Sequence, residues 1–467
     1  MRRYILASMS EGLNRNQDAV GRVYGHAGLL VAGSIGASLL GLASNILAAR
    51  RLGPGSYGFL ALLSTYAFSI IYGLVSFQSW QALIHFGAKA LVESKPDDFK
   101  GLIKFGFLLD MASAFAGGTL CATSLYIFAR LKGWDGVTTE IALLFSLGIF
   151  LRLTSSPTAV LRLFDRFDLL ALQQVAAAAL RAACVVIIYV GKAGLSAFLV
   201  VWLVTEIAGC WMTTLLGFWE LRKRGLKKVL RSPVRGITLR FPALWKFFII
   251  SNLQVSLRMA VKEVDILVIG GLLGAAAAGV YKIVRQFARA IGRLEEAMRQ
   301  AIYPDLSKKW AGRDSAEFRN LLWNPALVMA GLGILAWVGF LALGRSALRL
   351  TVGPNFETSY APILVYLAGV IVSMATFHFP SILLAMGRPG DILQASVVGA
   401  IGYLPLLAWL TRARGIIGAA LAFVAYQTLW SAWLGVKIRK GFALAGRIKP
   451  APAVLEEEGA VDSWTAG

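Results

Sequence analysis

Apolar runs of membrane-spanning length recur along almost the whole chain, from residue 27 to residue 438. A helix needs about 20 apolar residues to cross roughly 30 Å of hydrocarbon. Hydrophobic residues make up 57% of the 467 residues and charged residues only 15%, a balance that excludes an ordinary soluble domain. The sequence therefore predicts an all-α integral membrane protein with many spans.

About twelve transmembrane helices are predicted. They lie near residues 27–49, 57–82, 105–129, 138–160, 168–190, 195–219, 246–270, 279–303, 322–344, 361–386, 392–411 and 415–436. The first 26 residues are polar and basic, and the apolar run after them has no small-residue cleavage site. We therefore do not expect a removable signal peptide.

The positive charges predict the orientation of the chain in the membrane. With the N-terminus in the cytoplasm, the cytoplasmic segments hold 29 Lys and Arg residues and the opposite loops hold nine. Both termini should therefore be cytoplasmic. The largest basic cluster, residues 221–240, is an ordinary inside loop or a contact for anionic lipid headgroups.

The halves on either side of this basic cluster resemble each other. The turn "RLGPGSYG" after the first span is echoed by "LLGAAAAGVY" after the seventh, with Gly53 and Gly274 at an offset of 221. The other matching pairs are Asp168 with Asp391, at 223, and Gly191 with Gly415, at 224. Three offsets this similar indicate an internal repeat.

The repeat predicts the domain organisation. The expected segments are a cytoplasmic N-terminal segment (1–26), a six-helix bundle (27–220), a basic cytoplasmic linker (221–245), a second six-helix bundle (246–440) and a flexible cytoplasmic tail (441–467). Because six is even, the bundles share one orientation and are related by a parallel pseudo-twofold axis. In such proteins the substrate binds between the halves, and alternating access moves one half against the other.

Apart from Lys246 at the first position of its span, which is counted with the cytoplasmic segments, nine basic residues fall inside the predicted spans, where charge is expensive. They are Arg152, Arg181, Arg258, Lys262, Lys282, Arg285, Arg289, Arg293 and Arg299. Each costs roughly 2.5–3.5 kcal/mol at the bilayer centre, so each should face protein or a water-filled cavity. We expect a central cationic cavity with an anionic cargo, because the guanidinium fork suits phosphate oxygens.

The span near 279–303 is the most basic. On a helical wheel Lys282, Arg285, Arg289 and Arg293 fall within about 80° of one another, opposite an apolar face. A helix lining a wet cavity fits this pattern, and so does an amphipathic helix lying flat on the membrane. The flat helix would leave an odd number of spans, so we prefer the first. The predicted substrate-binding residues are Arg181, Arg258, Lys262, Lys282, Arg285, Arg289 and Arg293.

Three intramembrane carboxylates are candidates for coupling to a proton or a sodium ion: Asp110, Glu206 and Asp265. Asp110 and Glu206 have no local partner in the sequence, and pairing with Arg181 is the alternative role for them. Asp265 lies three residues after Lys262, which also fits an ion pair within one helix.

Motifs for catalysis are absent from the sequence. It contains no P-loop, GxSxG, HExxH or CxxC pattern, and its three cysteines all fall inside apolar runs. We therefore expect no metal, no cofactor, no catalytic residue and no nucleic-acid partner, and ATP hydrolysis by this chain is not predicted.

Three stretches resemble the polysaccharide biosynthesis flippases of the multidrug/oligosaccharidyl-lipid/polysaccharide exporter superfamily. They are "ARRLGPGSYGFLALL" from Ala49, "DILVIGGLLGAAAAGVYKIVRQF" from Asp265 and "AIYPDLSK" from Ala301. The resemblance implies a bacterial inner-membrane protein that moves polyprenyl-pyrophosphate-linked sugar units to the periplasmic leaflet for O-antigen, capsule or exopolysaccharide. It also implies membrane lipids, a polysaccharide polymerase and chain-length machinery as partners.

Two other transporters of the same superfamily remain alternatives. A cation-coupled drug or metabolite antiporter should have an acidic cavity, whereas this one is predicted to be basic. A peptidoglycan lipid-precursor flippase usually carries two further helices. A membrane-embedded glycan ligase or polymerase would need a substantial outer loop, and the predicted outer loops are all short.

The charge bias generates a topological prediction. A cysteine introduced at Ser232, with Cys121, Cys184 and Cys210 replaced, should resist a membrane-impermeant thiol reagent in intact cells, because this segment should be cytoplasmic. It should react after permeabilisation. Labelling of intact cells at Ser232 would reverse the predicted orientation.

Overall fold

The computed structural model describes residues 2–77, 79–93, 95–226, 229–311 and 315–445, and every regular element in these ranges is helical. The first half contains α1 (Arg2–Ser64), the π-helix η1 (Thr65–Ile71), α2 (Tyr72–Val75), α3 (Trp80–Val92), α4 (Pro96–Lys132), α5 (Gly136–Phe150), α6 (Ser155–Leu163), α7 (Phe167–Val190) and α8 (Leu195–Lys223). Between the halves lie the 3-10 helix η2 (Val229–Arg231) and α9 (Ile237–Arg240).

The second half is similarly built. It contains α10 (Leu244–Leu273), α11 (Ala275–Ala311), α12 (Ser315–Thr351), the 3-10 helix η3 (Pro354–Ser359), α13 (Tyr360–Ala375), α14 (Phe379–Ala385) and α15 (Pro389–Ala445). The predicted linker therefore starts slightly later than expected, after Lys223, and α15 extends into the predicted tail. Residues 446–467 of that tail lie outside the described residues.

Eight helical segments of the described chain are long and apolar enough to cross a membrane, which confirms the predicted fold class. Two of them, Ala32–Val75 and Gly390–Phe442, exceed the length of one span and are broken at glycines, Gly53 and Gly415, with positive φ. The helices α10 and α11, which carry most of the intramembrane charge, are not among the eight. The exact count of twelve spans stays a prediction.

Besides the span 57–82, which breaks between Val75 and Trp80, two predicted spans are interrupted where the sequence indicated continuous helices. The span 138–160 breaks between Phe150 and Ser155, and the span 361–386 breaks between Ala375 and Phe379. Each new helix starts with a proline near its first turn, Pro157 or Pro380, where a missing N–H costs nothing. Both breaks occur in the fourth predicted span of their half.

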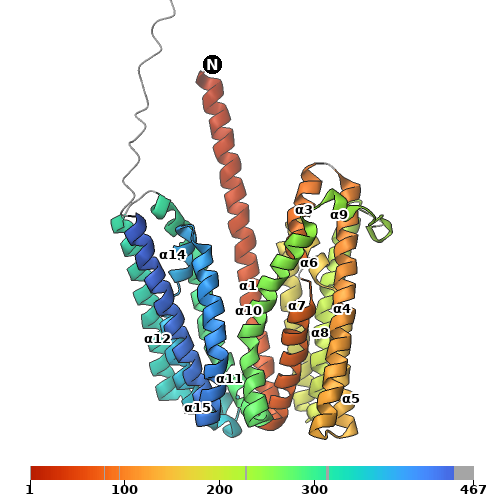
Figure 1. Cartoon of the computed structure of the whole chain (residues 1–467), viewed down its shortest axis with the longest axis vertical. Coiled ribbons are helices and arrows are strands. Elements are labelled where there is room, and N and C mark those ends of the chain that lie inside the picture. Colours follow the sequence, from red (N-terminus) through yellow and green to blue (C-terminus); the bar gives the residue numbers. More distant parts are fainter. Residues whose placement is uncertain (1, 78, 94, 227–228, 312–314, 446–467) are drawn as a thin grey trace, which may run out of the picture.

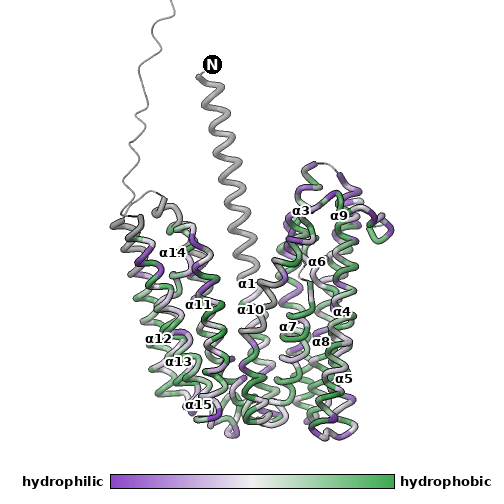
Figure 2. Tube along the Cα trace, viewed as in Figure 1, coloured by the Kyte–Doolittle hydropathy of each residue, from purple (hydrophilic) through white to green (hydrophobic). Residues whose placement is uncertain are grey.

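The helices form two groups (Figure 1). One group contains α3 to α9 and the other α11 to α15, and they meet at one end and diverge toward the end that carries the N-terminal part of α1. The helix α9 and the last turns of α15 lie at this open end too. Figure 2 shows apolar residues along most of both groups and polar residues gathered near the two ends, as a bilayer requires.

One glycine pair of the sequence repeat, Gly53 and Gly274, has the same backbone conformation, whereas Gly191 (φ −68°) and Gly415 (φ 61°) differ. Gly53 has φ 71° and ψ 174°, and Gly274 has φ 88° and ψ 173°. This region favours glycine because it has no Cβ. At each position one long helix ends and the next begins, so the chain reverses at equivalent points of the two halves.

The two halves touch backbone to backbone just after these turns. A Cβ on Gly58 would lie 1.7 Å from the carbonyl oxygen of Ala275, and a Cβ on Gly279 would lie 2.3 Å from that of Pro54. Gly58 corresponds to Gly279 and Pro54 to Ala275 at the offset of 221, so the two contacts are equivalent, as the predicted pseudo-twofold axis requires. Small residues allow this close helix crossing within a membrane.

The basic linker is folded against the first half rather than free. Val229 and Ile237 are buried in a cluster that includes Leu102 of α4. Arg240 forms an ion pair with Asp98 at the start of α4. The apolar side chains of the linker therefore pack inward while most of its arginines remain exposed.

The glycine crossing predicts an effect on stability. Gly58→Ala or Gly279→Ala should lower the melting temperature of the purified protein, because overpacking a rigid backbone contact costs about 1–3 kcal/mol or more. Gly55→Ala is the matched control, since no atom lies within 4 Å of its added Cβ. Thermal unfolding in detergent checks this, and equal melting of all three variants would contradict the close approach.

Candidate functional site

A cavity of about 290 Å³ lies between the two halves. Its walls come from α1, α7 and α8 of the first half and from α11 of the second. Three cations line it: Arg181 on α7, and Lys282 and Arg289 on α11. The uncharged polar side chains in the lining are Ser38, Asn45, Tyr57, Ser64, Trp202 and Gln286.

The helix α11 reaches this cavity with one face and packs into the protein with the other. Its buried residues include Tyr281, Ile283 and Val284, which are fully covered. Lys282 and Arg289 lie between these positions on the wheel and face the cavity. This arrangement agrees with a cavity-lining helix and not with a helix lying flat on the membrane surface.

Arg285, which we predicted to bind substrate, is buried behind the cavity wall. Its Nη1 lies 2.6 Å from Oδ1 of Asp265 on α10, and the two residues are 5% and 4% exposed. Asp265 also accepts hydrogen bonds from the Tyr281 hydroxyl, at 3.1 Å, and from the backbone N–H of Ile266, at 2.8 Å. The ion partner of Asp265 is thus Arg285 on the neighbouring helix, and the alternative pairing with Lys262 is not needed to satisfy it.

A second carboxylate of α10, Glu263, was absent from the predicted site. Its Oε1 lies 2.5 Å from Nη2 of Arg289, and its Oε2 lies 3.3 Å from Nη1 of Arg285. The Arg289 side chain is 49% exposed, so much of its guanidinium remains open to the cavity. Glu263 therefore neutralises part of the basic face of α11.

Glu206 on α8 holds two arginines in the first half. Its Oε2 lies 2.8 Å from Nη2 of Arg181, and its Oε1 lies 2.9 Å from Nη1 of Arg152. The Arg152 guanidinium also lies 4.1 Å from the centre of the Tyr72 ring, a cation–π distance. The pairing of Glu206 with Arg181 was one of our two interpretations. Arg152 was recognised as an intramembrane cation but not as part of the site.

Asp110 does not pair with Arg181. Its Oδ1 accepts a hydrogen bond from the Ser79 hydroxyl and its Oδ2 accepts one from the backbone N–H of Ser156, both at 2.8 Å. Ser156 is in the first turn of α6, where a negative charge satisfies unpaired N–H groups and the helix dipole. Asp110 thus joins α4 to the starts of α3 and α6.

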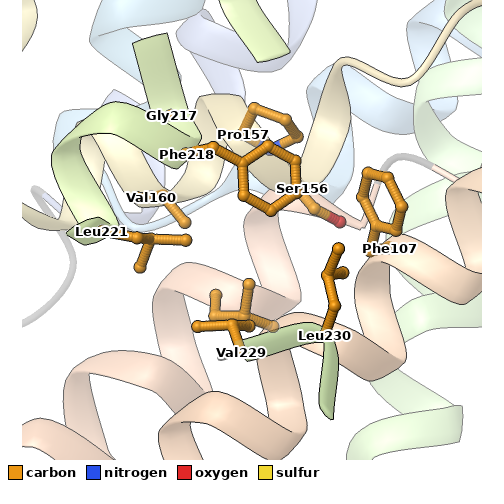
Figure 3. Close-up of a pocket in the computed structure, with 10 residues that line it drawn as sticks. Phe107, Ser156, Pro157, Val160, Gly217, Phe218, Leu221, Val229 and Leu230 are labelled. Carbon is orange, nitrogen blue, oxygen red and sulfur yellow. The ribbon is translucent and has the colours of Figure 1, made fainter. Parts of the chain in front are cut away.

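A smaller pocket lies beside Ser156 and is not a substrate site. Figure 3 shows that Phe107, Phe218, Val229 and Leu230 surround it. Its volume of about 10 Å³ is close to the minimum for a single water molecule. It lies where the linker packs on the first half.

The remaining predicted site residues cannot be assigned a position in the cavity. The backbones of Arg258 and Lys262 belong to α10 and that of Arg293 to α11, but their side chains lie outside the described part of the structure. The described network connected to the cavity consists of Arg152, Arg181, Lys282, Arg285, Arg289, Glu206, Glu263 and Asp265. Its five cations and three carboxylates leave a net charge of +2.

Comparison with known proteins adds two sequence findings. A family model described as polysaccharide biosynthesis protein matches residues 46–360. Inner membrane protein YghQ of Escherichia coli (strain K12) is 29% identical over 328 residues, which cover 69% of this chain and 90% of that protein.

Solved structures show the same fold at low sequence identity. The inward-facing conformation of a multidrug resistance MATE family transporter of the MOP superfamily aligns with a TM-score of 0.71, at 13% identity, over 90% of this chain and 100% of that chain. The lipid II flippase MurJ, in its inward closed conformation, aligns with a TM-score of 0.65, at 16% identity, over 89% of both chains. At these identities the likeness concerns the fold.

The contacts of Asp110 predict a structural role. Asp110→Ala should destabilise the purified protein by about 1–3 kcal/mol, because two buried donors lose their acceptor. Asp97→Ala, on the same helix, should cost less than about 1 kcal/mol, since the Asp97 side chain is 84% exposed. Thermal unfolding measures both. A fully stable Asp110→Ala protein that has lost a sodium or pH dependence of transport would restore the ion-coupling interpretation.

Proposed function

This chain belongs to the polysaccharide biosynthesis protein family, and we propose that it moves polyprenyl-pyrophosphate-linked oligosaccharides across the inner membrane. It is a multi-pass membrane protein of the flippase and transporter type. The proposed direction is from the cytoplasmic to the periplasmic leaflet. The glycan would serve O-antigen, capsule or exopolysaccharide synthesis.

The observation that supports this cargo is the cationic cavity between the halves, lined by Arg181, Lys282 and Arg289. A pyrophosphate cannot enter hydrocarbon unpaired, because burial of an isolated charge costs far more than binding returns. Fixed guanidinium groups replace its hydration with short charge-assisted hydrogen bonds. Each phosphate of a pyrophosphate diester carries one negative charge, which matches the +2 of the described network.

The uncharged part of the lining suits the sugar. Ser38 and Gln286 offer a hydroxyl and an amide group in the lining that contains the cations, and such groups bind sugar hydroxyls by neutral hydrogen bonds. The sugar head would therefore cross in the wet cavity with its pyrophosphate on the cations. The polyprenyl chain would stay in the lipid beside the protein.

The direction of opening fits loading from the cytoplasm. The two groups of helices diverge at the end that carries the N-terminal part of α1 and the basic helix α9 (Figure 1). With that end cytoplasmic, as the charge bias favours, the cavity faces the leaflet in which the cargo is made. Movement of one half against the other would then expose it on the opposite side.

We include no coupling ion in this proposal. Glu206 and Asp265 are both held in ion pairs at 2.6–2.9 Å. A proton or sodium ion would have to displace an arginine from either of them. The cavity also disfavours an antiporter of organic cations. A cationic cargo would be repelled by the arginine and lysine side chains that line the cavity.

Substitutions of Arg289 test the function. Arg289→Ala should reduce glycan export, because each charged hydrogen bond is worth about 1.5–3 kcal/mol, or roughly tenfold or more in binding. Arg289→Lys should be milder because it keeps the charge, and Arg289→Glu should be the most severe. Export is measured as surface glycan in cells at equal levels of folded protein.

The control for this series is Arg349, whose pair with Glu357 lies on α12 and η3, outside the cavity lining. Arg349→Ala should export at the parental rate. Parental export by Arg289→Glu at equal expression would refute the role of the cavity in translocation.

A further inference from the structure

Two carboxylates of α10 contact the basic face of α11, and they differ in their surroundings. Asp265 is buried and its oxygens are taken by Arg285, Tyr281 and the N–H of Ile266. The Glu263 side chain is 19% exposed and contacts the half-exposed Arg289. Asp265 therefore joins α10 to α11 in the protein interior, whereas Glu263 contacts Arg289, which lines the cavity.

We propose, on the basis of the proposed function, that Glu263 is an internal counter-anion. It forms an ion pair with Arg289 when the cavity is empty and releases Arg289 to the anionic group of the cargo. The competing ligand for Arg289 is then a phosphate oxygen. When the cargo leaves, the Glu263 carboxylate takes the guanidinium back. This exchange makes Glu263 a determinant of how tightly the cavity holds its cargo.

The geometry makes the exchange local. Glu263 Oε1 lies 2.5 Å from Arg289, while its other oxygen lies 3.3 Å from Arg285. Arg285 keeps the shorter contact of 2.6 Å with Asp265. Loss of Arg289 to a cargo therefore leaves the buried pair between the two helices intact, and only the half-exposed Arg289 and the partly buried Glu263 need to move.

The exchange also explains why a carboxylate contacts Arg289, one of the cations that line the cavity. A carrier must release what it binds, and three cations without a competitor would hold a pyrophosphate too firmly for rapid release. A tethered carboxylate lowers the net affinity without removing a contact to the cargo. Substrate binding that is too tight in the ground state does not speed turnover.

The test uses purified full-length protein with inorganic pyrophosphate as the probe, and titration calorimetry as the measurement. Glu263→Gln should bind pyrophosphate about tenfold more tightly than the parent, because Arg289 no longer has an anionic competitor. Arg289→Ala should bind more weakly. The double variant should bind like Arg289→Ala alone, because Glu263 acts through Arg289. Glu357→Gln removes a comparable carboxylate outside the cavity and should bind like the parent.

Export in cells separates this inference from the function on which it rests. Glu263→Gln should export glycan more slowly than the parent despite tighter binding, since release becomes limiting. If Arg289→Ala weakens binding but Glu263→Gln binds pyrophosphate no more tightly than the parent, the counter-anion role is wrong and the proposed function stands. If neither substitution changes binding or export, both are wrong.

Glu263→Asp provides a second test of the exchange in case the Glu263→Gln protein does not fold. It keeps the charge on a side chain one methylene shorter, so its contact with Arg289 should weaken. Pyrophosphate binding should then be tighter than in the parent. Unchanged or weaker binding by Glu263→Asp would contradict the exchange.

Discussion

The cost of placing charge in hydrocarbon governs the arrangement of this protein. The cations that interrupt the apolar spans are tolerated only where a carboxylate or water meets them. Arg285 is buried because Asp265 lies opposite, and Arg152 and Arg181 converge on Glu206. Among the described residues, the net positive charge that these carboxylates leave faces the cavity between the halves. The cost of unpaired charge thus accounts both for the ion pairs between helices and for the net positive charge of the cavity.

Much of this architecture could be predicted from the sequence, because its main signals are periodic and local. The lengths of the apolar runs predicted the membrane spans. The turns at Gly53 and Gly274 indicated the repeat, since their backbone geometry favours glycine. Cations on one face of α11 indicated a cavity, and Lys282 and Arg289 do line it. Arg181, predicted as an intramembrane cation, lines it too.

The errors arise where the outcome depends on a neighbouring helix. A helical wheel shows which face of α11 carries Arg285. It does not show that Asp265 of α10 forms an ion pair with this side chain. Glu263 was missed because its partner Arg289 lies 26 residues away, across the turn at Gly274. Asp110 looked unpartnered since its acceptor role involves a serine hydroxyl and a backbone N–H from two other helices. Local patterns carry no information on such contacts.

The glycine crossing has a mechanical consequence. The helix α11 continues 32 residues beyond Gly279, which at 1.5 Å per residue makes an arm of roughly 48 Å. If α11 tilts by about 10° about the glycine crossing, its far end moves by roughly 8 Å, whereas groups next to the glycines hardly move. Lys282 sits less than one turn from this fulcrum and Arg289 almost three turns from it. The same 10° tilt would move the backbone of Lys282 by roughly 1 Å and that of Arg289 by roughly 3 Å, so the two cations would shift by different amounts relative to Arg181 of the first half.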